Sequence, residues 1–244
     1  MILSDKDIKK YLENGRIGVE PLFPNSIQPA SVDVHLGADF MVFKTRDQIC
    51  IDPKQNIDDM MDKVKIDSDS HFILHPGQFA LGMTYEVISL GDDIVGHLDG
   101  KSSLGRIGLI VHATAGYIDP GNRLKITLEL HNIAELPIKL YYKMPIGQMT
   151  FIPLSTKADV PYGQKELGSK YYGAMKPQAS QYHKNFVKNN EWIDFKASRK
   201  AAAKSAAKSV AKKVEKVVPK NKPVVNKVKA KKVATKKVAP KRKR

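Results

Sequence analysis

The sequence contains a single cysteine, Cys50, among its 244 residues. One cysteine cannot form a disulfide within the chain or supply the several thiolates of a Cys-rich metal site. Long apolar runs are also missing, since none approaches the roughly 18 residues that span a bilayer. The first six residues lack the basic start and the apolar stretch of a signal peptide. We therefore expect a cytoplasmic protein with no membrane segment.

Acidic residues are nearly missing from the C-terminal part of the chain. Residues 196–244 contain 20 Lys and Arg but one acid, Glu215. They contain no aromatic residue and no aliphatic residue larger than valine, so they cannot bury enough apolar surface to offset chain entropy. The composition predicts a folded domain at residues 1–186, a linker at residues 187–195 and a disordered basic tail at residues 196–244.

The strong positive charge of the chain belongs to this tail. The preceding 195 residues carry 21 Lys and Arg against 24 Asp and Glu. Twenty cations without aromatic residues suit contact with phosphate backbone better than contact with base edges. The tail therefore predicts nonspecific nucleic-acid binding; the alternative is a low-complexity extension that aids solubility.

Short strands dominate the remaining pattern. Residues 4–14 predict a short amphipathic helix, with Ser4 as its N-cap, and residues 56–63 are compatible with one further helical turn. Elsewhere, short apolar or alternating runs are separated by Pro and Gly turns. The pattern predicts an all-β fold, which could be a sandwich, a jelly roll or a distorted barrel.

An alternating run at residues 124–131 has a chemical consequence. Side chains on a strand switch face at each residue, so Thr127, Glu129 and His131 are expected together on the face opposite the leucines. Glu129 could then lie on the floor of a polar site. The alternative is an ordinary solvated strand face.

Residues 100–106, with the sequence GKSSLGR, superficially resemble a phosphate-binding P-loop. A P-loop needs four residues between its first Gly and the Gly-Lys-Ser run, but Gly96 leaves three, and Val95 stands where a Gly is required. Residues 107–111 resemble a strand rather than the helix that follows a P-loop. The run predicts instead a turn or short helix that presents Lys101 and its neighbours to one anion, with a polar turn and solvated cations as the alternative.

Several motifs, in their order and spacing over some 185 residues, resemble the dCTP deaminase branch of the dUTPase superfamily, and in particular its bifunctional members that form dUMP. These motifs lie at residues 29–37 (PASVDVHLG), 100–106 (GKSSLGR), 112–121 (HATAGYIDPG), 127–129 (TLE), 146–148 (IGQ) and 168–171 (GSKY).

This resemblance implies a homotrimer of distorted β-barrels with dCTP or dUTP bound between subunits. It assigns Asp119 to the deoxyribose 3′-hydroxyl, the backbone of Thr127 and Leu128 to the base, and Glu129 to proton transfer. Further substrate-binding residues implied by the resemblance are Lys101, Ser102, Ser103, Leu104, Gly105 and Arg106 at the triphosphate, with Gln148, Tyr162 and Lys170 as additional contacts.

The resemblance also implies a deamination without zinc. Zinc-dependent deaminases need a P-C-x-x-C signature, which one cysteine cannot supply. Glu129 can instead accept a proton from water and return it to the departing amine, with Ser102 and the Ala115 carbonyl expected to hold that water. No protein side chain is expected to bind a metal, and Mg²⁺ is expected to arrive with the triphosphate.

Two neighbouring residues, Gly116 and Tyr117, resemble the pair found in bifunctional members. A small residue at Gly116 is expected to leave room for a water that attacks the α-phosphorus, giving dUMP and pyrophosphate. The alternatives are a deaminase that stops at dUTP, a dUTPase without deamination, and a nucleic-acid-bound protein that senses nucleotides.

The chain departs from the family pattern at three places. Asn122 stands where the family usually has an aromatic residue under the sugar, Arg123 and Leu124 replace a commonly small pair, and Ala174 replaces a nucleotide-contacting glutamine. These departures concern the sugar and the C-terminal lid. They predict weaker discrimination against ribose than is usual for the family; the alternative is that Arg123 contributes to the phosphate site of another subunit.

Overall fold

The computed structural model describes residues 1–44, 49–114 and 116–186. They lie within the first of the chain's two units, Met1–Asn189. They form fifteen strands, two α-helices and three 3₁₀ helices, which confirms the all-β prediction. Ala115 and the predicted linker and tail lie outside the described residues, so the statements about them stay predictions.

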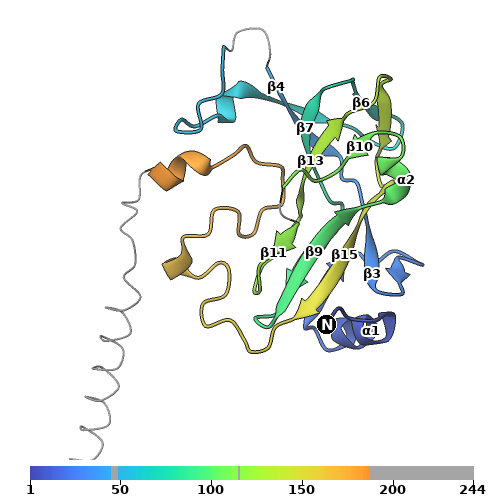
Figure 1. Ribbon diagram of the computed structural model, residues 1–244, viewed down its shortest axis with the longest axis vertical. Helices are drawn as coiled ribbons and strands as arrows, with labels where there is room; N and C mark the ends of the chain where they lie inside the picture. The colour runs from blue at the N-terminus through green and yellow to red at the C-terminus, as the bar shows by residue number, and fades with distance from the viewer. Residues whose placement is uncertain (45–48, 115, 187–244) are drawn as a thin grey trace, which may run out of the picture. The chain divides into compact units, whose positions relative to one another are not determined.

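The N-terminal helix is confirmed as α1 (Asp5–Glu13), drawn in blue in Figure 1. The Ser4 side chain accepts a hydrogen bond from the backbone N–H of Asp7, which caps the first turn. Ile8 is fully buried and anchors the helix to the core. Among the described residues, none of the helices is both long and apolar enough to cross a membrane.

The first five-stranded sheet positions a row of polar side chains. Its central strand places Gln148 directly between Asp33 and Asp99 of the neighbouring strands. All three therefore point to one face of the sheet. In pairing order the strands are β11 (Tyr117–Ile118), β9 (Ile94–Gly100), β15 (Pro145–Pro153), β3 (Ser31–His35) and β2 (Ile27–Gln28).

The second five-stranded sheet carries the predicted alternating strand. Leu128 and Leu130 are fully buried, while Glu129 between them is partly exposed, so the predicted division of faces is confirmed. In pairing order the strands are β10 (Leu109–Ile110), β13 (Thr127–Asn132), β7 (Phe79–Met83), β4 (Asp39–Phe43) and β5 (Met61–Lys65).

The alternating run is not one continuous strand. Leu124 belongs to a different sheet from β13, and the chain changes sheets at Lys125 and Ile126. There the N–H of Ile126 donates to the Thr84 hydroxyl, and the N–H of Lys125 donates to the carbonyl of Ala174. Alternation along the sequence predicts which side chains are buried. It cannot show that Thr84 and Ala174, which are remote in the sequence, accept these backbone hydrogen bonds.

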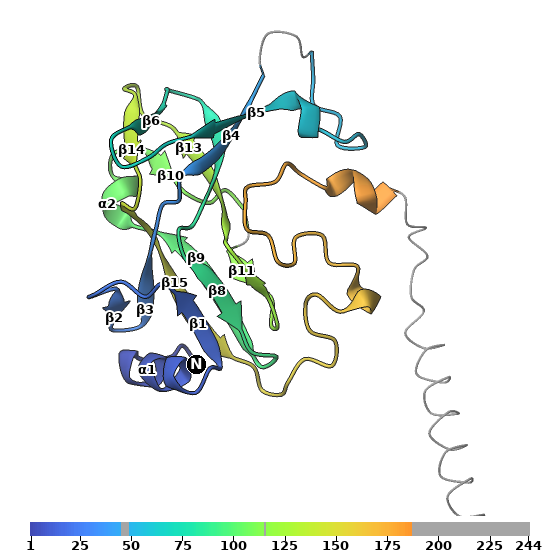
Figure 2. The same cartoon turned by 180° about the vertical axis from the view of Figure 1, so that it is seen from behind.

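Two smaller sheets and several short helices complete the fold (Figures 1 and 2). A helical turn does occur within residues 56–63, but the last part of that range enters β5. Hydrogen bonding thus groups the strands into four sheets, giving a jelly-roll-like body with no closed barrel among the described residues. The remaining elements are β1 (Ile17–Glu20), β8 (Val87–Leu90), β12 (Arg123–Leu124), β6 (His71–Leu74), β14 (Ile138–Tyr141), α2 (Ser102–Gly105), η1 (Asp58–Met60), η2 (Lys165–Leu167) and η3 (Tyr182–Phe186).

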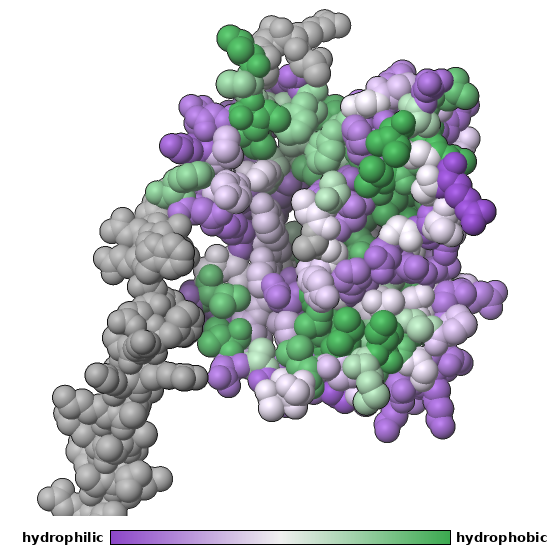
Figure 3. Space-filling view, viewed as in Figure 1, coloured by the Kyte–Doolittle hydropathy of each residue, from purple (hydrophilic) through white to green (hydrophobic). Residues whose placement is uncertain are grey.

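One large hydrophobic cluster forms the main core of the described residues, and a second, smaller cluster contains Met41, Ile57, Met61 and Ala179. The main core includes the fully buried Phe151, Ile94 and Leu128, one from each of the strands β15, β9 and β13 that carry the polar rows. Burying side chains of this kind stabilises the fold by about 1.5–3 kcal/mol each. On the face shown in Figure 3, apolar residues form small patches separated by hydrophilic ones. The core thus packs against the face of each strand that lies opposite its polar side chains, and it holds these strands in place.

Candidate functional site

Two adjoining cavities lie where β9, β11 and β13 approach one another. The first, called the α2 cavity, has a volume of about 650 Å³ and borders the N-terminal end of α2. The second, called the β13 cavity, has a volume of about 540 Å³ and borders β13 and residues 154–186, which we call the C-terminal segment. Leu98, His112 and Gly116 line both cavities. One elongated ligand could therefore reach from one cavity into the other.

Most of the predicted site residues line these cavities. Lys101, Ser102, Ser103, Gly105 and Gln148 line the α2 cavity. Tyr117, Asp119, Thr127, Glu129 and Tyr162 line the β13 cavity. Of the predicted residues that the structure describes, Leu104, Arg106, Leu128 and Lys170 line neither cavity.

Residues 100–110 form one wall of the α2 cavity, which we call the α2 wall. It consists of a short helix followed by a strand, one of the two forms expected for this run. The chain leaves β9 at Gly100, makes one helical turn and enters β10. Ser102 and Ser103 are exposed, so their hydroxyls can donate to an anion in the cavity. Successive backbone N–H groups do not wrap the cavity as they would in a P-loop, because three of them, from Leu104 to Arg106, donate to Lys101 and Ser102 carbonyls.

The Lys101 ammonium already has an anionic partner that the sequence did not reveal. Its Nζ lies 2.7 Å from Oδ1 of Asp33 on β3, and both side chains are mostly buried. This pair fixes the ammonium at the cavity wall and offsets part of its charge. Asp33 lies within the motif at residues 29–37, but the motif alone did not show which cation it meets.

Glu129 is held by the loop that follows β10. Its Oε2 accepts hydrogen bonds from the Ala113 N–H at 3.0 Å and from the Thr114 hydroxyl at 3.1 Å. Nδ1 of His112 lies 3.8 Å from the same oxygen. The Glu129 side chain is still 25% exposed, so the carboxylate is fixed on one side and open to the β13 cavity on the other.

Gly116 lies where β11 approaches β9 too closely for any side chain. The N–H of Leu98 donates to the Gly116 carbonyl at 2.8 Å. A Cβ atom added at Gly116 would lie 2.3 Å from the Leu98 carbonyl oxygen. The small residue is therefore required by backbone contact, which is a different reason from the predicted space for water.

Tyr117 lines the β13 cavity and contacts His97, which lines the α2 cavity. Its ring is 63% exposed and meets the His97 ring edge-on, with 4.9 Å between the centroids. Nδ1 of His97 in turn lies 3.1 Å from Oδ2 of Asp99. Because His97 and Asp99 line the α2 cavity, this cavity contains acidic as well as basic groups.

A tight turn after β11 carries Asp119 and Asn122. The N–H of Asn122 donates to the Asp119 carbonyl, and Gly121 has a positive φ of 81°. Asn122 is buried, whereas Asp119 is exposed. Both residues line the β13 cavity, so the turn presents a carboxylate and an amide to the same space.

The C-terminal segment covers part of the β13 cavity of its own chain. Tyr162, Tyr171 and Ala174 line the cavity, and the buried Ala174 accepts a backbone hydrogen bond from Lys125. Lys170 points elsewhere, because its Nζ donates to the Asn185 side chain. Ala174 thus serves as a packing residue, and Lys170 does not meet the other predicted contacts within one chain.

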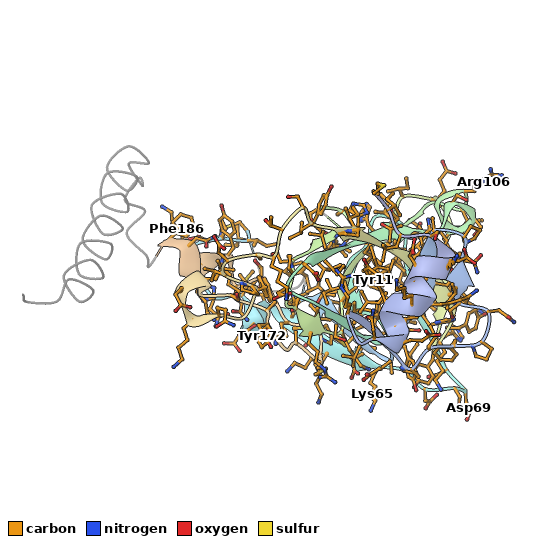
Figure 4. The ribbon with its side chains drawn as sticks, turned by 90° about the horizontal axis from the view of Figure 1, so that it is seen from below. Tyr11, Lys65, Asp69, Arg106, Tyr172 and Phe186 are labelled. Carbon is orange, nitrogen blue, oxygen red and sulfur yellow. The ribbon has the colours of Figure 1, made fainter. Side chains whose placement is uncertain are left out.

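The α2 wall and the C-terminal segment lie on opposite sides of the sheets in both ribbon views (Figures 1 and 2). Arg106 is exposed and points outward at the far end of the molecule from Tyr172 and Phe186 (Figure 4). One chain therefore does not bring all of the predicted nucleotide contacts together. Among the described residues, no cluster of three or more His, Cys, Asp or Glu side chains could hold a metal ion.

Comparison with known proteins finds similar sequences and structures. A family described as dCTP deaminase-like matches residues 2–154. A protein named "dCTP deaminase, dUMP-forming" from Pseudarthrobacter chlorophenolicus is 49% identical over 76% of this chain and 97% of its own length. A protein of the same name from Nocardia farcinica is 48% identical over 82% of this chain and 100% of its own length. A solved 2′-deoxycytidine 5′-triphosphate deaminase from Agrobacterium tumefaciens has 22% identity and a TM-score of 0.49, over 62% of this chain and 47% of that chain. The two sequence relatives are covered almost completely, whereas about a fifth to a quarter of this chain extends beyond the match.

Proposed function

Because the chain belongs to the dCTP deaminase-like family, we propose that it converts dCTP to dUMP with release of ammonia and pyrophosphate. Its relatives named "dCTP deaminase, dUMP-forming" support both parts of this reaction. The observation that carries the proposal is the carboxylate of Glu129, held by Ala113 and Thr114 yet open to the β13 cavity.

In the deamination, water adds to C4 of the cytosine ring. Glu129 transfers one proton of this water to N3 as the oxygen adds to C4, and then transfers the hydroxyl proton to the exocyclic nitrogen, so that ammonia leaves and the C4 carbonyl of uracil forms. Ser102 and the Ala115 carbonyl are proposed to hold the water. Asp119 is proposed to bind the 3′-hydroxyl, and the Thr127 and Leu128 backbone to face the base.

The triphosphate is proposed to bind along the α2 wall. Lys101, Ser102 and Ser103 offer an ammonium and two hydroxyls there, and Gln148 adds an amide. Mg²⁺ is proposed to bind through the phosphate oxygens and water that it prefers. No protein side chain is assigned to the metal, and zinc takes no part.

In the second step, water attacks the α-phosphorus and pyrophosphate leaves, so that the product is dUMP. Gly116 and Tyr117 are proposed to shape the place of this attack, since Gly116 lines both cavities and Tyr117 lines the β13 cavity beside it. Incubating the purified protein with dCTP and Mg²⁺ tests the reaction. Accumulation of dUTP would indicate a deaminase only, and an unchanged substrate would indicate a nucleotide-binding protein.

The active site is proposed to lie between subunits of a homotrimer. Arg106 and the C-terminal segment lie far apart in one chain (Figure 4), and one subunit can supply what its neighbour lacks. We expect Arg106→Ala and Glu129→Gln proteins to be nearly inactive alone but partly active when coexpressed, because some mixed sites then have both native residues. Ammonia release by the copurified mixture measures this. Inactivity of mixed trimers, verified by mass spectrometry, would place the Arg106 and Glu129 of each site within one subunit.

The tail at residues 196–244 is proposed to bind nucleic acid nonspecifically through its 20 basic residues. Truncation after Phe195 is expected to lower the affinity for duplex DNA at low salt by at least about a hundredfold and to remove most of the salt dependence, because counterion release drives such binding. Fluorescence anisotropy across a salt series measures both. A tail of scrambled sequence should keep the affinity, and unchanged binding after truncation would contradict the proposal.

A further inference from the structure

One buried side chain on the wall of the β13 cavity has an unsatisfied polar atom. Asn122 is 6% exposed, and its Oδ1 has no hydrogen-bond partner among the described residues. Its backbone is satisfied, since the N–H donates to Asp119 and the carbonyl accepts from Leu90. A buried acceptor without a partner destabilises a fold, so such an atom in a native site requires an explanation.

Elsewhere the fold satisfies a buried asparagine completely. Asn132 is fully buried; its Nδ2 donates to the carbonyls of Leu74 and Leu136, and its Oδ1 accepts from the N–H of Ala134. These bonds fix the loop after β13, which gives Asn132 a structural role. Asn122 makes no such side-chain bonds within the described residues, so its amide does not stabilise the turn that carries it.

The position of Asn122 relative to Asp119 is fixed by the backbone. The turn between them closes through their own hydrogen bond, and Gly121 adopts a positive φ in which an added Cβ would lie 2.6 Å from Pro161. The N–H of Tyr162 also donates to the Pro120 carbonyl, which ties the turn to the C-terminal segment. Both residues also line the β13 cavity, so a ligand bound there can lie beside both side chains.

Resting on the proposed function, we propose that Asn122 determines sugar specificity by binding the 2′-hydroxyl of a ribonucleotide, so that CTP is a second substrate of this site. A ribose presents two neighbouring hydroxyls, of which Asp119 can bind one and Asn122 the other. An amide offers both an acceptor and donors, so either orientation of the Asn122 side chain can pair with a hydroxyl. Deoxyribose leaves that amide without a ligand partner.

The test compares kcat/KM for dCTP and CTP in the full chain and in Asn122→Leu, which keeps a similar size without polar atoms. The native protein is expected to prefer dCTP over CTP by less than about a thousandfold. Asn122→Leu is expected to raise this preference by at least about tenfold, because the 2′-hydroxyl loses its partner. A native preference above a thousandfold, or an unchanged preference in Asn122→Leu, would overturn the proposal.

Asn132→Leu is the matched control, because it removes a buried asparagine that lines neither cavity. It is expected to lower Tm and leave the preference between dCTP and CTP unchanged, whereas Asn122→Leu should keep or raise Tm. An equal loss of Tm in both variants would make Asn122 structural and overturn the proposal.

A lack of turnover with both dCTP and CTP would refute the proposed function without refuting the role of Asn122. If the native protein turned over neither nucleotide, calorimetric binding of CTP and dCTP would still test Asn122. A loss of CTP affinity of at least about tenfold in Asn122→Leu, with dCTP affinity kept, would support its role. An equal change for both nucleotides would overturn it.

Discussion

Replacing Glu129 with glutamine is expected to lower the rate of dCTP deamination by about a thousandfold or more, since positioned acid–base groups contribute about 10²–10⁴-fold. Glutamine has nearly the same shape and keeps an oxygen that can accept from Ala113 or Thr114, so the site should stay intact. It cannot accept and return the proton, however. Ammonia release measures the rate, and calorimetry with dCTP should show an affinity within a few-fold of the native value.

The matched control for this change is Glu135→Gln. Glu135 is exposed and lines neither the α2 cavity nor the β13 cavity, so its loss of charge should leave ammonia release unchanged. Substantial turnover by Glu129→Gln would remove Glu129 from its role in proton transfer. Loss of dCTP binding together with turnover would instead make it a binding residue.

Gly116→Ala is expected to reduce dUMP formation by at least about tenfold and to lower the free energy of unfolding by about 1–3 kcal/mol, as overpacking does. The new Cβ would meet the Leu98 carbonyl oxygen at 2.3 Å, so β11 must move away from β9. That movement displaces Tyr117 and the wall that the two cavities share at Leu98 and Gly116. Chromatography of the dCTP products measures the first effect, and urea denaturation measures the second.

Gly105→Ala controls for the stability effect alone. An added Cβ at Gly105 meets nothing within 4 Å, so the free energy of unfolding should change by less than about 1 kcal/mol. If Gly116→Ala kept native stability and native dUMP output, the close approach of β11 and β9 would have no functional importance. A shift of product from dUMP to dUTP at unchanged ammonia release would assign Gly116 to the second step.

Local patterns in the sequence predicted the elements of the site well. The short helix α2 is one of the two forms, a turn or a short helix, that were expected around Lys101, and the face of Glu129 followed from the period of two along a strand. Both features depend on residues that are close together in the sequence. The break before β13 was missed because its cause is the hydrogen bonds with Thr84 and Ala174, which are remote in the sequence.

The partners of the functional groups could not be predicted in the same way. Asp33 meets Lys101 only because β3 and β9 both pair with β15. The contacts of Glu129 with Ala113 and Thr114 likewise depend on how the loop after β10 folds back on β13. Alternation assigns a side chain to a face, but the neighbours on that face are fixed by sheet order and register.

One folded chain does not bring together all of the residues that the sequence motifs assign to the site. The motifs treat Arg106 and Lys170 as parts of one nucleotide site. In the structure, Arg106 lies exposed beyond α2, and Lys170 binds Asn185 on the C-terminal segment. Sequence spacing cannot show which subunit supplies each group, and we propose that a neighbouring subunit of a trimer supplies the groups that one chain does not bring together.

The central claim is that one site performs both steps on dCTP. The most direct measurement is a time course with dCTP and Mg²⁺ in which ammonia, pyrophosphate, dUTP and dUMP are quantified together. We predict that ammonia, pyrophosphate and dUMP appear in equal amounts, with no accumulation of free dUTP. Ammonia release with dUTP accumulating and no pyrophosphate would contradict the claim.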